Sequence, residues 1–414
     1  MAMSDNERQP LLENLLDQSP QKTSYDRKTF QPDLSRYPST PTLNNRLLKN
    51  HVVALFVISF DTKSGNVVEY CVPSGVQLNA VEFKAMPSGS HTVSEDFVYF
   101  RNGQDLYGLS CFKRIQVDNQ EERGVRMKSV GILCKHFITL HLHMPFLESE
   151  VVKQLNSPGN YQRLQEYFTN NIDLNESLIQ PYGSNTSVLK ITHPAGCFSQ
   201  FIKFFGVKIF PLWRLILLQK KILFYSPPPV GIACYRVYCC SLLSSSSISL
   251  RESQTQPQFY VNVADIAELS STKTYVACTT EKVFESKKNL YDAFIDIRNI
   301  SSTSPNIEPL TKVTSEDRKR FAALSQLRPI GSLQEQLQQG DEESEEKYIR
   351  FFRAMNDILF QKLTDISSNP DNQISNSELE EMGLYPGADK VFLTQLIELY
   401  NFNVDLQPDC VFCC

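Results

Sequence analysis

The stretch KKILFYSPPPVG, residues 220–231, decides the fold. A basic pair precedes an apolar run from Ile222 to Tyr225, and three prolines follow. Proline cannot donate to a sheet and favours the first turn of a helix, so the prolines end the predicted strand. The apolar sequence GIACYRVYCCSLL then predicts a buried helix. In an α/β sheet such a connection lies at the carboxyl edge, where ligands usually bind.

Strand and helix patterns alternate around this stretch. Residues 197–220 have apolar side chains at spacings of three and four, which predicts a helix that Pro211 kinks or restarts. QFYVNV (258–263) and TYVACT (274–279) predict strands separated by a helical turn, and EKVFESKKNLYDAFIDI (281–297) predicts a helix and a strand. The alternation predicts an α/β lobe over residues 188–300, with a mostly parallel sheet covered on both faces.

Residues 50–170 predict a different unit. HVVALFVISF (51–60) and VVEYCV (67–72) predict one hairpin, and the strands around Asn102-Gly103 predict a second. VRMKSVGILC (125–134) predicts a fifth strand, and two helical segments follow, interrupted at Pro158-Gly159. This pattern is typical of a small α+β domain.

The remaining segments complete a mixed α/β architecture. Residues 1–49 are polar and rich in proline, which predicts a disordered arm. Residues 301–348 predict a helix and the acidic linker QEQLQQGDEESEEK, read as a solvated spacer. Residues 349–414 predict a C-terminal helical part, with Ser377 and Glu380 forming a capping box. SSNPDNQISNSE (367–378) overlays loosely on a calcium-binding loop, but we expect it only to cap a helix.

Composition excludes several function classes. The net charge of −5 over 414 residues gives no broad basic field, so nucleic acid is not expected as a ligand. Eleven cysteines, mostly in apolar segments, indicate reduced thiols and a cytoplasmic protein. The apolar segment Phe201–Leu218 carries Lys203, Lys208 and Arg214, which favours a core helix over a membrane span. The chain has neither GxxxxGK[ST] nor GxGxxG, and we expect no cofactor and no metal.

Two terminal motifs suggest membrane traffic. ERQPLL places Glu7 four residues before Leu11 and Leu12, a spacing similar to acidic dileucine sorting signals that bind adaptor proteins. Two leucines in a flexible tail without a role are the other interpretation. The chain ends in CVFCC, so Cys413 and Cys414 are candidates for lipidation.

One charged stretch, EERGVRMKSVG, carries a candidate catalytic residue. Arg123 lies beside Gly124, immediately before the strand that begins near Arg126. A guanidinium held by a rigid turn can act as an arginine finger on a γ-phosphate. A solvated surface arginine is the alternative.

Four long segments resemble DENN-domain proteins, specifically the LCHN branch. They are HVVALFVISFDTKSGNVVEYCVP, KITHPAGCFSQFIKFFG, KILFYSPPPVGIACYRVYCC and YVNVADIAEL. The resemblance implies a longin-like lobe followed by a DENN lobe, with a groove between them in which a Rab-type small GTPase docks. A single continuous sheet through both lobes that left no groove would contradict this expectation.

The resemblance implies a guanine nucleotide exchange factor. Such a protein needs no covalent chemistry, because it promotes GDP-to-GTP exchange by binding the nucleotide-free GTPase most tightly. We therefore assign no catalytic residue, and we find no hydrolase or transferase site. Lys220, Lys221 and Ser226 are candidate GTPase contacts, chosen because we place them at the sheet edge.

Two alternatives remain open. In the folliculin-like branch an arginine in an R-G-x-x-R segment stimulates GTP hydrolysis, and Arg123-Gly124-Val125-Arg126 shares only the start of that pattern. The other alternative is a non-catalytic membrane-traffic scaffold, recruited to intracellular vesicles by peripheral membrane contact or by adaptors that bind the N-terminal arm.

Overall fold

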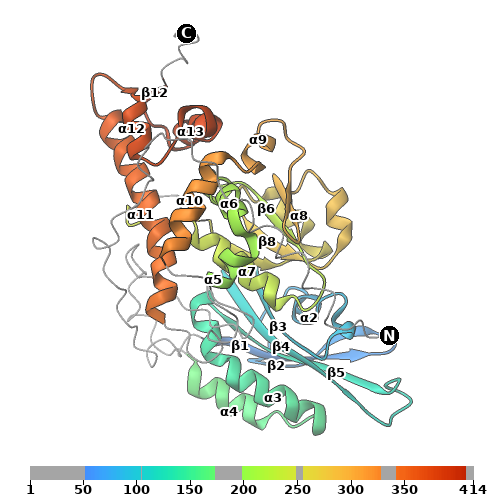
Figure 1. Ribbon diagram of the computed structural model, residues 1–414. Helices are drawn as coiled ribbons and strands as arrows, with labels where there is room; N and C mark the ends of the chain where they lie inside the picture. Colours follow the sequence, from blue (N-terminus) through green and yellow to red (C-terminus); the bar gives the residue numbers. More distant parts are fainter. Residues whose placement is uncertain (1–51, 104, 173–197, 249–254, 328–341, 407–414) are drawn as a thin grey trace.

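A computed structural model describes residues 52–103, 105–172, 198–248, 255–327 and 342–406 (Figure 1). We call residues 52–172 the N-terminal lobe, 198–327 the central lobe and 342–406 the C-terminal helices. The strands are β1 Val52–Asp61, β2 Gly65–Val72, β3 Glu95–Asn102, β4 Leu106–Gln116, β5 Val125–Cys134, β6 Ile222–Tyr225, β7 Pro257–Tyr260, β8 Val276–Thr279, β9 Ala293–Asp296, β10 Asn299–Ser301, β11 Gln373–Ile374 and β12 Asp405–Leu406.

The α-helices are fewer in the N-terminal lobe than in the rest of the described chain. They are α2 Val81–Ala85, α3 Met144–Asn156, α4 Gln162–Asn171, α5 Phe198–Phe205, α6 Ile209–Leu217, α7 Gly231–Leu242, α8 Ile266–Ser271, α9 Glu308–Thr311, α10 Ser315–Gln326, α11 Glu342–Ser367, α12 Asn376–Glu381 and α13 Pro386–Tyr400. The mixed α/β fold class predicted from the sequence is confirmed.

The five predicted strands of the N-terminal lobe form an antiparallel sheet in the order β3-β4-β5-β1-β2. The β3–β4 turn contains Gly103 at φ 68°, a conformation that glycine adopts without steric cost. Gly131 is required for packing, because a Cβ there would lie 2.2 Å from the ring of Phe56. Helices α3 and α4 pack against β4, β5, β1 and β2 (Figure 1). The two hairpins and the fifth strand therefore form where the sequence predicts them.

In the central lobe, β9, β6, β8 and β7 are parallel neighbours, as predicted. Alternate side chains face two cores: Ile222 and Phe224 belong to the main core, and Leu223 belongs to a second core on the other face. This period of two explains why the strand sequences are apolar throughout. Pro211 lies in the first turn of α6, where a missing N–H costs little, and the segment Gly206–Lys208 separates α6 from α5.

The two lobes share one sheet of ten strands, in the order β10-β9-β6-β8-β7-β3-β4-β5-β1-β2. The expectation of two separate sheets is therefore wrong. Only one residue pair, Phe100 with Tyr260, connects β3 to β7, where every other neighbouring pair has several. The two lobes form one sheet because their buried apolar side chains belong to the same core, which extends across the junction without a break.

Polar contacts reinforce this narrow junction. The Lys84 ammonium, on α2, lies 2.7 Å from the Asp265 carboxylate of the central lobe, and both side chains are buried. Arg101 donates to the Gln258 side chain at 3.2 Å. Thr280, directly after β8, donates to the carbonyl of Ser88 at 3.0 Å. The carboxyl ends of the parallel strands thus contact the N-terminal lobe. That lobe covers part of the sheet edge at which the sequence predicts a ligand.

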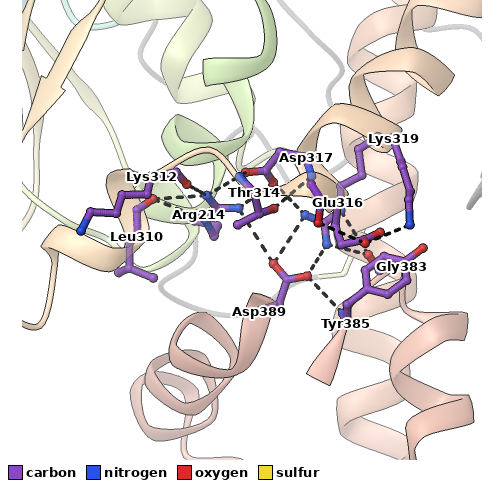
Figure 2. A network of polar contacts seen from close by, with 12 residues as sticks. Arg214, Leu310, Lys312, Thr314, Glu316, Asp317, Lys319, Gly383, Tyr385 and Asp389 are labelled. Carbon is purple, nitrogen blue, oxygen red and sulfur yellow. Dashed lines mark hydrogen bonds and ion pairs between the residues drawn. The ribbon is translucent and has the colours of Figure 1, made fainter. Parts of the chain in front are cut away.

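A buried ionic network attaches the C-terminal helices to the central lobe. Arg214 of α6 donates to both oxygens of Asp317, at 2.7 and 3.0 Å, and Arg320 bridges Asp317 and Asp389. Figure 2 shows Arg214, Asp317 and Asp389 converging from three helices. Burial alone would lower the pKa of Arg320, but Asp389 and Asp317 raise it above its ordinary value. The network holds α6, α10 and α13 together.

Three local predictions differ from the structure. The capping box at α12 consists of Ser375 and Glu378, two residues before the predicted pair Ser377 and Glu380. The segment Lys282–Ser286 is a 3-10 helix instead of an α-helix. The acidic residues from Glu342 onward begin α11 instead of continuing a spacer, and Glu345 accepts a hydrogen bond from the backbone of Ser199 at 2.8 Å. Within the described ranges, no helix combines the length and the apolar character that crossing a membrane requires.

Candidate functional site

A pocket of about 560 Å³ opens beside the junction of the lobes. Its walls come from the end of β1, the start of β2, α2 with the loop after it, and the β4–β5 turn. Glu281, which follows β8, adds the central lobe to the lining. The lining residues are Phe60, Thr62, Asn66, Phe83, Met86, Pro87, Ser88, Gly89, Ser90, His91, Glu122, Arg123, Val125, Met127 and Glu281. We call this the junction pocket.

The β4–β5 turn forms one wall of the junction pocket. Arg123 and Gly124 have φ values of 53° and 78°, and their N–H groups donate to Gln120 and Asn119 at 3.1 Å. Thr62 donates to the carbonyl of Glu121 at 3.2 Å, which ties the β1–β2 turn to this wall. The left-handed backbone conformation of Arg123 is uncommon for residues other than glycine and asparagine, and the surrounding hydrogen bonds hold the turn in this conformation.

The segment after α2 forms the opposite wall. Asn66 of β2 donates to the carbonyls of Glu82 and Met86, at 3.2 and 3.0 Å, and so fixes α2 on the sheet. The Ser90 hydroxyl donates to Pro87 at 2.7 Å and closes the following turn. Gly89 has φ 87°, and a Cβ there would lie 3.0 Å from the Pro228 ring. The proline connection of the central lobe therefore rests on this wall.

The junction pocket combines exposed aromatic rings with charged side chains, of which Glu122 is paired with Arg126. Phe60 and Phe83 are 39% and 50% exposed, although phenylalanine is normally buried. Burial raises the pKa of the Glu281 carboxyl, and the hydrogen bond that it accepts from Val263 at 2.8 Å offsets this in part. Exposed aromatic groups beside charged side chains are typical of surfaces that bind another protein.

Arg123 lies on the rim of the junction pocket and is exposed. Among the described residues, its side chain has no hydrogen-bond or ion-pair partner. Arg126, by contrast, pairs with Glu122 at 2.7 Å and donates to the carbonyl of Leu155 at 2.7 Å. Of the two arginines in this segment, only Arg123 is placed to contact a bound partner.

Lys220, Lys221 and Ser226 do not come together. Ser226 follows β6 and so lies at the carboxyl edge of the parallel strands, as predicted, whereas Lys220 and Lys221 lie at the opposite, amino edge. The two lysines precede β6 and Ser226 follows it, which separates them by the length of a four-residue strand, roughly 13 Å. The backbone of Lys221 is bonded to Asp292, and Ser226 donates from its backbone to Thr279 at 3.0 Å. They do not form one site with the junction pocket.

The other candidates lie outside the described residues. These are the sorting residues Glu7, Leu11 and Leu12 and the lipidation residues Cys413 and Cys414. Conversely, no local sequence pattern indicates Phe60, Phe83 or Glu281 as site residues. Phe83 belongs to a helix of five residues, too short for its periodicity to separate an exposed position from a buried one.

Comparison with known proteins identifies the family. Residues 55–307 match the family of DENN domain-containing protein 11. The protein of that name from Danio rerio is 43% identical over 385 residues, which cover 87% of this chain and 77% of the relative. The Xenopus laevis protein is 42% identical over 385 residues, covering 88% and 87%, and the Mus musculus protein is 43% identical over 379 residues, covering 87% and 83%. The chain belongs to the DENN domain-containing protein 11 family.

The region matched to the DENN domain-containing protein 11 family contains the whole junction pocket, from Phe60 to Glu281. It also contains both strands of the narrow sheet junction, β3 and β7. Helices α9 to α13 lie beyond residue 307. The family match thus covers nearly all of the N-terminal lobe, the central lobe up to residue 307 and the site between them.

Proposed function

We propose that this chain is a guanine nucleotide exchange factor for a Rab-type small GTPase and that the GTPase docks at the junction pocket. DENN-domain proteins act in general on Rab GTPases, which supports the proposal at the level of the family. The observation that carries it is the pocket itself, in which exposed Phe60 and Phe83 lie with Arg123 beside a residue of the central lobe. The longin-like character of the N-terminal lobe and the assignment to the LCHN branch belong to the same proposal.

The continuous sheet changes the predicted geometry of docking. A GTPase cannot dock between separate sheets of the two lobes, because their strands form one sheet joined through β3 and β7. It docks instead on one side of the junction, where Glu281 of the central lobe lines the pocket and the nearby Val263 and Val283 are exposed. A partner that spans the junction contacts both lobes without separating them.

The proposed mechanism is differential binding. Exchange is accelerated only by contacts that are stronger with the nucleotide-free GTPase than with the nucleotide-bound form. Each tenfold preference supplies about 1.4 kcal/mol toward displacing the nucleotide. Phe60 and Phe83 supply apolar area for such contacts, and Arg123 supplies a charge that can pair with a carboxylate.

The test is release of labelled GDP from a panel of purified Rab proteins. We expect the full chain to accelerate release from at least one Rab without changing GTP hydrolysis. Phe83→Ser should weaken this effect, while Leu399→Ser, at a 40% exposed position on α13, should not. An unchanged rate of GDP release across the whole panel would reject the proposal.

The second candidate function rests on Arg123. Its exposed position in a strained turn on the pocket rim favours a GTPase-activating role by an arginine finger. In that case the chain would accelerate GTP hydrolysis, and Arg123→Ala would abolish the acceleration. The scaffold alternative, with cytoplasmic location and recruitment to vesicles through Leu11 and Leu12 or through Cys413 and Cys414, predicts neither activity.

A further inference from the structure

Two guanidinium groups lie over the ring of Phe204, near the end of α5, and a lysine binds the backbone of one of these arginines. The Arg236 Cζ atom, on α7, lies 3.6 Å from the ring centroid, and the Arg298 Cζ atom lies 4.7 Å from the same centroid. Lys208 donates from its ammonium group to the carbonyl of Arg298 at 2.9 Å. The side chains come from three separate segments of the central lobe, so the fold assembles the cluster.

The described residues supply no anion for this cluster. None of the three cationic side chains forms an ion pair within the described ranges, and Asp296, two residues before Arg298, forms none either. Burial lowers the pKa of Arg236 to about 10, and the neighbouring charge of Arg298 acts in the same direction. Cation–π contact with Phe204 compensates only in part for bringing like charges together. The cluster is therefore prepared for an external anion.

The turn that carries Arg298 shows a second unusual feature. Ile297 and Arg298 form a two-residue connection between β9 and β10, since Asp296 pairs with Asn299. Ile297 has φ 55° and is 62% exposed. Turns of this length normally place glycine or asparagine at positive φ, and a β-branched residue there is strained. Such strain concentrates at functional sites. The turn thus presents an apolar side chain next to the cationic cluster.

We propose that Arg236, Arg298 and Lys208 form a binding site for a phosphate monoester. The two guanidinium carbons lie at most about 8 Å apart, because both contact one ring. Binding of one phosphate by both groups requires that they approach the ring from the same side and donate N–H···O bonds of about 2.8 Å. Three oxygens with nearly two negative charges match three cationic donors better than one carboxylate does. The phosphate comes from a lipid headgroup or from a soluble phosphorylated molecule. This site is separate from the proposed exchange activity.

The experiment uses the full chain and three probes. These are phosphatidylcholine vesicles carrying a phosphorylated phosphatidylinositol, vesicles of matched charge carrying phosphatidylserine, and soluble inositol phosphate. We expect binding to a monoester probe and a loss of about tenfold or more in both Arg298→Gln and Arg236→Gln, since each removes a charged hydrogen-bond donor pair. Lys153→Gln, at an exposed lysine of α3, makes the same charge change elsewhere and should leave binding intact.

Ile297→Asn distinguishes the two sources of phosphate. Asparagine tolerates positive φ, so this variant should fold at least as stably as the wild type. If the ligand is a lipid, the variant weakens vesicle binding and leaves inositol phosphate binding unchanged. If the ligand is soluble, both stay unchanged. Binding of neither monoester probe, equal binding to phosphatidylserine vesicles, or full binding by Arg298→Gln would overturn the proposal. Arg298 is exposed, so this result stands even if Arg236→Gln fails to fold.

Discussion

The carboxylate of Asp96, in the N-terminal lobe, accepts a hydrogen bond from the backbone N–H of Val230, in the central lobe, at 2.6 Å. Its second oxygen accepts from Gly231 at 3.0 Å. The first N–H groups of a helix have no partner inside the helix, so Asp96 caps α7 from the other lobe. The two lobes are therefore connected by a helix cap as well as by the single pair of β3 and β7.

Replacing Asp96 by alanine and by asparagine tests how much its acceptor oxygens contribute to stability. Asp96→Ala leaves the buried N–H groups of Val230 and Gly231 without an acceptor, whereas Asp96→Asn retains one acceptor oxygen. We expect the alanine variant to be less stable than the asparagine variant by about 1–2 kcal/mol. Urea unfolding of the full chain measures the difference. Equal stability of the two variants would show that the cap contributes nothing.

The same carboxylate predicts a pH dependence. Burial raises the pKa of Asp96 to about 6, although the amides of Val230 and Gly231 act in the opposite direction. Because this pKa lies above that of an unfolded aspartate, the folded chain binds the proton more tightly between about pH 4 and pH 6. The contribution of Asp96 to the free energy of unfolding therefore falls as the pH rises through this window, by up to about 3 kcal/mol.

The measurement compares wild type with Asp96→Asn at several pH values, because other groups titrate in both proteins. The stability of the wild type relative to the variant should decrease from pH 4.5 to pH 6.5, a range set about the folded pKa, and remain level above it. A relative stability that is constant or rises with pH would contradict the assignment.

The buried network in Figure 2 predicts a large stability change. Asp317 pairs with both Arg214 and Arg320, and all three side chains are at most 2% exposed. Asp317→Asn leaves two buried cations with one fewer anion, so we expect a loss of about 3–5 kcal/mol. Glu308→Gln breaks an exposed pair with Lys312 and should cost less than about 1 kcal/mol. Similar losses in the two variants, measured by chemical denaturation, would rule out a structural role for the network.

Local patterns predicted most elements of this fold because apolar residues recur at different spacings in strands and in helices. The strand β5 begins and ends as VRMKSVGILC predicts, and the prolines end β6 where expected. The misplaced cap at α12 has a simple cause. Ser375 with Glu378 and Ser377 with Glu380 satisfy the same spacing, and only the structure selects the first pair.

The junction and the pocket could not be read from the sequence. Phe100 and Tyr260 are far apart in the chain, and one bridging pair leaves no periodic signal in either strand. Asp96 looks like any polar residue at the start of a strand, and its role appears only when α7 packs against β3. Arg123 was identified because its turn is a local feature. Its neighbours in the pocket come from distant segments and were missed.

The proposed exchange mechanism requires that the junction pocket bind a nucleotide-free GTPase in preference to a GDP-bound one. The most direct test measures the affinity of the full chain for a responsive Rab in the nucleotide-free and GDP-bound states. We predict at least about tenfold tighter binding of the nucleotide-free form, a preference reduced in Phe83→Ser and retained in Leu399→Ser. Equal affinity for the two states, or a preference that Phe83→Ser leaves unchanged, would show that the junction pocket does not drive exchange.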